Sequence, residues 1–269
     1  MPALSAVVNV YNKPSELRLV LAALSRQTFR DFEAVIADDG SGPAVRQVVE
    51  EASARYDYPI RHAWHEDTGW RRTASLNNGV RSAAADYLVF FDGDCIPSEY
   101  FLEDHMRERE PRRVLLGRRV EMGEGWARTL TMERVLNGAF EHLGWSGFLE
   151  GLRKESKRVE DSIRITSPLV RRLLLRNVRG MLGSNFSLWK SDLEAVNGFD
   201  EEYTSYGLEE SDLQYRLSLI GVTGKPMRNV AIQYHIWHPQ NAVPSAMMER
   251  FREVQQRGEP RCRRGLVTL

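Results

Sequence analysis

The first 120 residues of the chain alternate short apolar runs with helical patterns of leucine, valine and alanine. We expect strands over four of these runs: Leu4–Val10, Phe32–Ala37, Pro59–Trp64 and Tyr87–Phe91. Helical spacing between the runs predicts helices that begin at Pro14, include Val45–Ala52, and cover Arg72–Ala83. Such alternation is typical of right-handed βαβ units. It predicts an α/β fold with a mostly parallel central sheet flanked by helices.

The second half of the chain has a less regular pattern. Residues 123–182 carry mixed charge and scattered glycines, so we expect loops and helices there that line an acceptor site. Isolated aromatic residues in this stretch are Trp126, Trp145 and Phe148. Regular patterns then predict a strand over Ser184–Trp189, a short helix opened by a Ser191–Glu194 capping box, a helix over Glu209–Leu219 and a strand near Val230–Tyr234. No linker separates the halves, which indicates one continuous domain.

Composition excludes several classes of protein. Lys plus Arg and Asp plus Glu number 37 each, so we expect no nucleic acid partner, although the Arg250–Arg264 tail is locally basic. No apolar stretch approaches the roughly 20 residues that cross a bilayer, and the first residues do not resemble a signal peptide. Cys95 and Cys262 are too few for a disulfide framework. We therefore expect a cytoplasmic protein without a membrane span, in which the basic tail could make peripheral membrane contact.

Polar residues directly follow three of the expected strands. The three clusters are Tyr11-Asn12, Asp38-Asp39 and Asp92-Gly93-Asp94. Because ligands of open parallel sheets bind beyond the carboxyl ends of the strands, we expect the clusters to meet at one crevice. Asp38 and Asp39 allow two interpretations, a turn that caps the next helix or carboxylates that accept hydrogen bonds from a nucleotide base stacked on Tyr11.

Asp92 and Asp94, separated by Gly93, suit a hard cation such as Mg²⁺ or Mn²⁺. Such an ion can bridge the phosphate oxygens of a nucleotide and stabilise a departing diphosphate. The alternative is an ordinary polar turn after a strand. Either His235 or His238 could complete the metal shell with Asp94, because imidazole is a common ligand of Mn²⁺-type sites.

The acidic start of the Glu209–Leu219 helix points to a second site. Helical spacing places Glu209 and Glu210 in line with Leu213, so both carboxylates extend the buried stripe. The helix dipole favours acidic residues in a first turn but does not explain this orientation. Asp212 faces elsewhere, and Arg216 lies four residues on, so we expect an ion pair between them in solvent.

Taken together, these segments resemble the inverting family-two glycosyltransferases of the GT-A fold. The matching text, in order over roughly residues 4 to 239, is VVNVYNKP, RQTFRDFEAVIADDGS, GWRRTASLNNGVRSAAADYLVFFDGDCIP, GSNFSLWKSDLEAVNGFDEEYTSYGLEESDLQYRL and YHIWHP. The second half looks especially like the galactosyltransferase and chondroitin-polymerase branch. Two positions depart from the family pattern: Glu210 stands where aspartate is usual, and Tyr206 where tryptophan is usual.

The resemblance implies a role for each candidate residue. Asp38, Asp39 and Tyr11 would bind the nucleotide base, and Arg72, Asn77, Asp92 and Gly93 would lie along the donor. Asp94 would be the direct metal ligand, joined by His235 or His238. Glu210 would be the catalytic base and Glu209 an acceptor-binding acid, with Asp212 as the other candidate base on the same helix.

The implied activity is that of a metal-dependent inverting glycosyltransferase with Mn²⁺ or Mg²⁺ as cofactor. The donor would be a nucleotide-diphosphate sugar, UDP-linked, and the acceptor a hydroxyl of a glycan, a lipid-linked sugar or a small molecule, as in polysaccharide biosynthesis. Residues 1–120 would form the donor half, and 121–269 the acceptor half with the catalytic helix and the tail. Two alternatives are a nucleotidyltransferase, although VVNVYNKP is not a glycine-rich phosphate loop, and a non-catalytic sugar-nucleotide-binding module.

Overall fold

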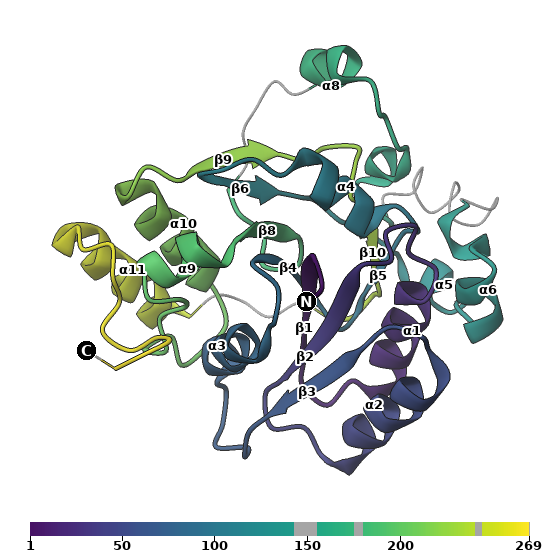
Figure 1. The fold of residues 1–269 in the computed structure, drawn as a ribbon, viewed down its shortest axis with the longest axis horizontal. Helices are drawn as coiled ribbons and strands as arrows, with labels where there is room; N and C mark the ends of the chain where they lie inside the picture. Colours follow the sequence, from purple (N-terminus) through teal and green to yellow (C-terminus); the bar gives the residue numbers. More distant parts are fainter. Residues whose placement is uncertain (143–154, 175–179, 240–243, 269) are drawn as a thin grey trace.

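A seven-stranded sheet runs through the computed structural model in the order β3-β2-β1-β4-β8-β6-β9 (Figure 1). The structure describes residues 1–142, 155–174, 180–239 and 244–268. The strands of this sheet are β1 (Leu4–Val10), β2 (Phe32–Asp38), β3 (Ile60–Trp64), β4 (Tyr87–Asp92), β6 (Arg113–Leu116), β8 (Phe186–Trp189) and β9 (Thr223–Pro226). Strands β3, β2, β1 and β4 are parallel, as are β6 and β9, whereas β8 is antiparallel to both neighbours. The predicted α/β fold with a mostly parallel sheet is confirmed.

Helices cover both faces of the large sheet (Figure 1). One apolar core includes residues of α1 (Pro14–Leu24), α2 (Pro43–Arg55) and α4 (Phe101–Glu108). The core on the other face includes residues of α3 (Arg72–Ser82), α9 (Lys190–Ala195) and α10 (Glu209–Leu219). Further helices are α5 (Glu124–Ala127), α6 (Met132–Leu136), α8 (Pro168–Leu174) and α11 (Ser245–Arg257), with 3-10 turns η1 (Ala139–Glu141) and η2 (Val159–Ser162). Val7 and Val8 of β1 lie in opposite cores, which is why this strand is apolar almost throughout.

A second, three-stranded sheet lies beside the carboxyl end of β4. It has the order β5-β10-β7, formed by β5 (Cys95–Pro97), β10 (Gln233–His235) and β7 (Val120–Glu121). Because β5 follows β4 after two residues, this sheet brings segments from the middle and the end of the chain to the Asp92–Asp94 turn.

The register of the large sheet places the three polar clusters side by side. Val10 pairs with Asp38, and Asn9 pairs with Asp92. The backbone N–H of Gly93 donates to the carbonyl of Asn9 at 2.7 Å, and a Cβ at Gly93 would lie only 3.0 Å from that carbonyl oxygen. The predicted convergence of the clusters is therefore confirmed, and glycine permits this close approach of β4 to β1.

Three expected boundaries in the second half are wrong, the first being the start of the strand expected from Ser184, which begins only at Phe186. The strand expected from Val230 begins only at Gln233, because Asn229 and Ala231 have left-handed backbones with φ of 60° and 49°. The Ser191 capping box does not form, because α9 begins at Lys190, before Ser191. The N-cap of α9 is Trp189, which makes no side-chain cap bond. By contrast, β1 and α10 have the predicted bounds.

The aromatic residues of the 123–182 stretch do not all line an open site. Trp126 is 2% exposed and packs edge-on against the ring of Tyr234 at 5.7 Å, so it belongs to the core and does not line an acceptor site. Trp145 and Phe148 lie outside the described residues. Strand β6 of the first half pairs with β8 and β9 of the second, so one sheet spans both halves. The assignment of donor and acceptor roles to the two halves stays a prediction.

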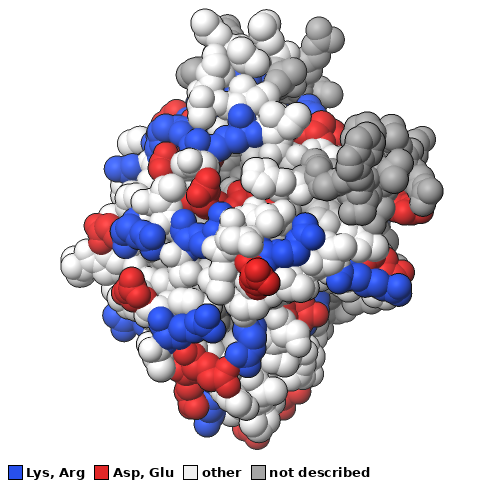
Figure 2. All heavy atoms as spheres, turned by 90° about the vertical axis from the view of Figure 1, so that its right-hand side faces the viewer, with Lys and Arg blue, Asp and Glu red and all other residues white. Residues whose placement is uncertain are grey.

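The face of the molecule shown in Figure 2 carries acidic and basic side chains side by side, in keeping with the balanced composition. Within the described part of the chain, no helix has the length and apolar character that crossing a bilayer requires.

Candidate active site

Three polar side chains meet where β4 leaves the large sheet. Asp94 follows β4, and His235 ends β10, which places it opposite Cys95 of β5. His235 Nε2 lies 3.8 Å from Asp94 Oδ1, and His238 Nε2 lies 3.3 Å from Asp94 Oδ2. The two Nε2 atoms are 3.1 Å apart. The sequence left open which histidine accompanies Asp94, and the structure places both beside it.

The acceptors behind the two imidazole rings fix the nitrogens that face Asp94. His235 Nδ1 is 2.9 Å from Glu121 Oε2, and His238 Nδ1 is 2.8 Å from the carbonyl oxygen of Pro239. Both partners accept hydrogen bonds, so each Nδ1 carries a proton and Nε2 is the ring nitrogen that faces Asp94. The hydrogen bond with Asp94 raises the pKa of His238, so in the absence of a cation a proton on Nε2 of His238 is favoured. Two imidazole nitrogens and one carboxylate form a donor set that suits Mn²⁺-type ions.

Glu121 holds the His235 ring in place as an ionised carboxylate. Burial alone would raise the pKa of Glu121, but the hydrogen bond with His235 and the ion pair with Arg119 outweigh it and lower this pKa to about 2. Arg119 Nε donates to Glu121 Oε1 at 2.8 Å. A carboxylate behind a metal-binding imidazole orients the ring and raises its basicity.

Asp94 is buried, with 5% of its surface exposed, yet it remains ionised. Burial alone would raise its pKa, but the hydrogen bond to His238 and the charges of His235 and Lys13 outweigh this effect and hold the pKa of Asp94 well below its usual range. Lys13 Nζ donates to Asp94 Oδ2 at 2.5 Å. Without a metal, Lys13 therefore supplies the positive charge that a buried carboxylate needs.

Cys95 lies close enough to Asp94 and His235 to be considered as a third ligand. Burial and the adjacent charge of Asp94 raise the pKa of the Cys95 thiol well above its usual range. The thiolate is the form of cysteine that binds metals, and hard cations prefer oxygen and nitrogen. Cys95 therefore fits the core better than a metal shell.

Arg72 joins the Asp92 turn to the acidic start of α10. Its Nη2 lies 3.0 Å from Asp92 Oδ1, its Nη1 lies 3.2 Å from Glu209 Oε1, and the same Nη1 contacts Glu210 Oε1. A Cβ at Gly183 would collide with the Glu210 carboxylate, so glycine keeps that space open. Three carboxylates therefore surround one guanidinium, and Arg72 links two regions that the sequence analysis treated as separate sites.

The two glutamates of this pair lie in different environments. Glu209 is 2% exposed and accepts a hydrogen bond from the backbone N–H of Gly207 at 2.8 Å. Burial, followed by the charge of Glu210, raises the pKa of Glu209 to about 7, against the opposing effect of Arg72. The side chain of Glu210 is 14% exposed and is thus the more accessible of the two.

Tyr11 and Asp39 directly follow the carboxyl ends of β1 and β2, and Asp39 is only 4% exposed. Tyr11 is 49% exposed, and its hydroxyl donates to Asp67 Oδ2 at 3.0 Å. Asp39 accepts from the backbone N–H of Arg71 at 3.1 Å and contacts His65 Nε2 at 3.0 Å. Each carboxylate oxygen of Asp39 retains a lone pair, so this residue can still accept a hydrogen bond from a ligand.

Asp38 and Asn77 are directed inward and bond to the protein, and the donor roles that the resemblance implies for them stay predictions. Asp38 is fully buried, accepts from the backbone N–H of Ser41 at 2.8 Å and contacts His62 Nε2 at 2.8 Å. It therefore shapes the turn after β2. Asn77 is fully buried, donates to the carbonyl of Phe199 at 2.9 Å and accepts from its backbone N–H at 3.0 Å. Asn77 thus ties α3 to the 197–200 turn.

Asp212 and Arg216 form the predicted ion pair, but its placement in solvent is wrong. Asp212 Oδ2 lies 2.7 Å from Arg216 Nη2, and the two side chains are 0% and 1% exposed. Arg216 Nη1 also donates to the carbonyls of Val196 and Gly198 at 2.8 and 3.0 Å. The turn after α9 covers this face of α10, which removes the pair from water.

This burial predicts a large loss of stability in Asp212→Asn, because Arg216 would remain buried without its counterion. We expect the free energy of unfolding to fall by about 3–5 kcal/mol, measured by denaturant titration. Glu124→Gln is the matched control, because Glu124 and Arg128 have the same i,i+4 spacing but are 50% and 77% exposed. That control should change stability by less than about 0.5 kcal/mol. Equal effects in the two variants would contradict the buried placement.

Sequence patterns did not identify several residues that support the site. Lys13 and Glu121 reach Asp94 and His235 from distant segments; Lys13 stands in the VVNVYNKP text but was assigned no role, and Glu121 stands in no motif. His65 and Arg119 likewise hold Asp39 and Glu121. Of these residues, only Lys13 could have been assigned to the site from sequence, because it closely follows the strand β1 at the predicted crevice.

Comparison with known proteins agrees with this architecture. The family model "Glycosyl transferase family 2" matches residues 5–178, and the model "N-terminal domain of galactosyltransferase" matches residues 175–239. A validoxylamine A glucosyltransferase of Streptomyces hygroscopicus subsp. jinggangensis is 30% identical over 235 residues, covering 82% of this chain and 53% of that protein. The chondroitin synthase of Escherichia coli is 26% identical over 240 residues, covering 86% of this chain and 34% of that protein. The chain thus spans about half the length of these relatives, or less.

Solved structures share the fold at low sequence identity. Mannosyltransferase PcManGT from Pyrobaculum calidifontis, solved with GDP-Man and Mn²⁺, has a TM-score of 0.58 at 17% identity, covering 93% of this chain and 61% of that one. S. aureus TarS 1-349 has a TM-score of 0.60 at 19% identity, covering 95% and 64%. These likenesses confirm the GT-A fold. With its family model matched over residues 5–178 of 269, the chain belongs to glycosyl transferase family 2.

Proposed function

We propose that the chain transfers a sugar from a nucleotide-diphosphate donor to an acceptor hydroxyl, with inversion at the anomeric carbon. The observation that carries the proposal is the meeting of two groups of side chains at one sheet end. Asp94, His235 and His238 form a cation-binding donor set. Asp92 connects through Arg72 to Glu210, the most exposed carboxylate of the acid pair. A cation site beside an accessible carboxylate is what displacement of a diphosphate by a hydroxyl requires.

Asp94, His235 and His238 would hold the divalent cation, Mn²⁺ or Mg²⁺. The geometry supports this assignment because the two Nε2 atoms, 3.1 Å apart, and the Asp94 carboxylate converge on one point, where a cation could replace the proton and the Lys13 ammonium. When bound, the ion would neutralise the charge that develops on the leaving diphosphate. A bound ion would also release Lys13 from its ion pair with Asp94, so that the ammonium could contact a phosphate.

Donor binding would use the rim of the crevice. Tyr11 is exposed enough to stack on a nucleotide base, and Asp39 can accept a hydrogen bond from a base N–H. His65 and the backbone of Arg71 hold Asp39 in place for this contact. A uracil base has such an N–H, and we therefore propose a UDP-linked donor.

Glu210 would act as the general base. It would accept the proton of the acceptor hydroxyl while the hydroxyl oxygen forms a bond to the anomeric carbon. The bond from that carbon to the diphosphate oxygen would break with its electron pair leaving on the diphosphate. Arg72, which contacts Glu210 and Asp92, would position the carboxylate. Glu209, buried behind it, would bind an acceptor hydroxyl. A single displacement inverts the configuration.

The acceptor would be a hydroxyl of a glycan or glycoconjugate. Trp237 is 45% exposed and lines a pocket with Met122 and Lys157 beside the two histidines. An exposed indole in a pocket offers an apolar platform on which a sugar ring can stack.

The direct test is incubation with Mn²⁺ and a panel of UDP- and GDP-sugars, with free nucleotide diphosphate as the readout. We expect one donor to release its nucleotide diphosphate in the presence of Mn²⁺ but not of a chelator. Proton NMR of the product should show the inverted anomer. Binding without release of nucleotide diphosphate would indicate a sugar-nucleotide-binding module, and release of inorganic pyrophosphate from a nucleoside triphosphate would indicate a nucleotidyltransferase.

Replacing either histidine should weaken binding of the cation, since each variant removes one donor of three. We expect His235→Ala and His238→Ala to raise the Mn²⁺ dissociation constant by about tenfold or more, measured by calorimetry and by the concentration for half-maximal activity. Cys95→Ser is the control and should leave both values unchanged. If the dissociation constant is unchanged in one histidine variant, that histidine has a structural role. If it is unchanged in both variants, neither imidazole belongs to the cation site.

A further inference from the structure

Ala231 has a backbone conformation that is unusual for alanine. Its φ is 49°, in the left-handed region, and the residue is fully buried. This conformation is unfavourable for a residue with a Cβ, so its surroundings must hold it in place. Ala231 lies two residues before β10, the strand that ends at His235. The path of the chain at Ala231 therefore decides where β10 starts and where the His235 ring lies.

Two buried side chains hold the peptide groups on either side of Ala231. The backbone N–H of Ala231 donates to Asp104 Oδ2 at 2.9 Å, and its carbonyl accepts from Asn185 Nδ2 at 2.9 Å. Asp104 is fixed in turn by Arg164, whose Nη2 and Nε donate to its two carboxylate oxygens at 2.6 and 3.0 Å. We refer to Asp104 and Asn185, both 0% exposed, as the Ala231 clamp.

Asn185 also holds the segment that leads to β7. The same Nδ2 donates to the carbonyl of Arg118 at 2.6 Å, three residues before Glu121. A Cβ at Gly117 would lie 2.0 Å from Asn185 Oδ1, so glycine leaves the space that the amide fills. One carboxamide thus joins the segment before β10, which carries His235, to the segment before β7, which carries Glu121.

A chain of buried polar groups sets the orientation of the Asn185 amide. Because Nδ2 faces two carbonyls, Oδ1 faces His105, whose Nε2 lies 3.1 Å away and therefore carries the proton. His105 Nδ1 then accepts from the Ser187 hydroxyl at 2.8 Å, and the Tyr87 hydroxyl donates to Ser187 Oγ at 2.8 Å. Burial lowers the pKa of His105 to about 4, so the ring is neutral near pH 7. The amide therefore keeps both N–H groups directed at the two backbone carbonyls.

We propose that Asn185 is a positioning residue of the cation site and acts through the turn at Ala231. By holding this turn and the start of β7, it keeps the His235 ring directed at Asp94, with Glu121 behind the ring. The inference rests on the proposed function, because it concerns the site in which Asp94 and the histidines would bind a divalent cation. Among the described residues, Asn185 forms no hydrogen bond with Asp94, His235 or Glu121, so its effect on them is indirect.

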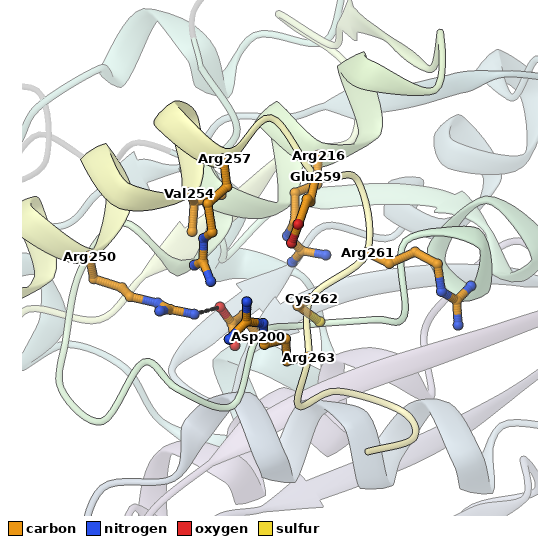
Figure 3. Close-up of a pocket in the computed structure, with 9 residues that line it drawn as sticks. All are labelled: Asp200, Arg216, Arg250, Val254, Arg257, Glu259, Arg261, Cys262 and Arg263. Carbon is orange, nitrogen blue, oxygen red and sulfur yellow. Dashed lines mark hydrogen bonds and ion pairs between the residues drawn. The ribbon is translucent and has the colours of Figure 1, made fainter. Parts of the chain in front are cut away.

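Asn197 provides a matched control. It is 1% exposed, donates through Nδ2 to the carbonyls of Cys262 and Val267 at 2.9 Å each, and accepts from the backbone N–H of Val267 at 3.0 Å. It thus resembles Asn185 in burial and in hydrogen bonding. Its partners, however, belong to the tail after α11, where Cys262 and Arg250 line a small recess whose lining includes no residue of the cation site (Figure 3).

The test replaces each asparagine by aspartate in the full chain. Aspartate keeps the size of the side chain and its acceptor oxygen, but it donates at most one hydrogen bond in place of two. We expect both variants to lower the melting temperature, while only Asn185→Asp raises the Mn²⁺ dissociation constant, by about tenfold or more, measured by calorimetry. An added negative charge would strengthen cation binding, so weaker binding must come from displaced ligands. Asn185→Ser is the second variant if Asn185→Asp does not fold.

Ala231→Gly tests the route from the clamp to β10. Glycine adopts the left-handed conformation readily, so Ala231→Gly alone should bind Mn²⁺ like the wild type. Added to Asn185→Asp, it should recover at least about threefold of the lost affinity, because the turn no longer needs the clamp to stay left-handed. If the double variant recovers no affinity, the proposed route through Ala231 is wrong.

NMR spectra of the histidine rings, recorded with a chelator present, separate this inference from the proposed function. We expect the ring signals of His235 to shift in Asn185→Asp and to keep their wild-type positions in Asn197→Asp. If the wild type does not bind Mn²⁺, the proposed cation site fails, and these spectra still decide whether Asn185 positions His235. The inference is overturned if Asn185→Asp leaves the His235 signals unchanged, or if Asn197→Asp shifts them equally.

Discussion

Glu210→Gln lowers turnover by about 10²–10⁴-fold and leaves donor binding nearly unchanged. The physical reason is that glutamine keeps the size and hydrogen-bonding capacity of the side chain but cannot accept a proton from the acceptor. Arg72 retains Asp92 and Glu209 as partners, so the local structure should persist. The measurement is steady-state release of nucleotide diphosphate, with donor affinity from calorimetry. Glu210→Asp, which restores the residue usual in the family, should retain more activity than the glutamine variant.

Glu209→Gln is the informative control for this assignment. Glu209 should contribute to acceptor binding, so its replacement should raise the KM for acceptor more than it lowers kcat. The raised pKa of Glu209, about 7, nevertheless makes it a competent base near neutral pH. A wild-type kcat that rises between about pH 6 and 8, and a Glu209→Gln variant without activity, would assign proton removal to Glu209. Near wild-type turnover in Glu210→Gln would contradict the present assignment.

The first half of the fold could be predicted from sequence because its strands are buried on both faces. Val7 and Val8 lie in different cores, so β1 must be apolar at successive positions, and its bounds are easy to recognise. The carboxyl ends of parallel strands share one edge, which is why the polar clusters could be placed together before the structure was known. These inferences require only local patterns and the geometry of parallel sheets.

The parts that could not be predicted depend on contacts between distant segments. The hydrogen bond between His235 and Glu121 requires β7 and β10 to pair, and no sequence pattern in either short segment predicts that pairing. The spacing of Asp212 and Arg216 predicted an ion pair, but its burial depends on the turn after α9. The resemblance to the family implied a donor role for Asn77, but the side-chain amide of Asn77 is hydrogen-bonded to the backbone of the 197–200 turn. Sequence spacing therefore identified the partners of an ion pair, but the burial of that pair could be known only from the tertiary structure.

Asp94→Asn is expected to remove turnover almost completely, by at least about 10³-fold, because a neutral amide is a poor replacement for the only carboxylate in the proposed donor set. Asparagine keeps the shape of a residue that is 5% exposed, so the fold should survive, and Lys13, whose side chain is 36% exposed, can turn to solvent. Circular dichroism and the melting temperature check the fold, while Mn²⁺ calorimetry and release of nucleotide diphosphate check the site.

Asp67→Asn provides the matched control for Asp94→Asn. Asp67 is also a carboxylate at the crevice, but it pairs with Tyr11 at the exposed rim and contacts neither histidine. It should therefore keep the wild-type affinity for Mn²⁺, and any loss should be confined to donor binding. If Asp94→Asn instead kept wild-type turnover in excess chelator, the charge of Asp94 would serve only to hold Lys13, His235 and His238 together. The stabilisation of the leaving diphosphate would then have to come from the cationic side chains, with Lys13 and Arg72 the nearest to the Asp92–Asp94 turn.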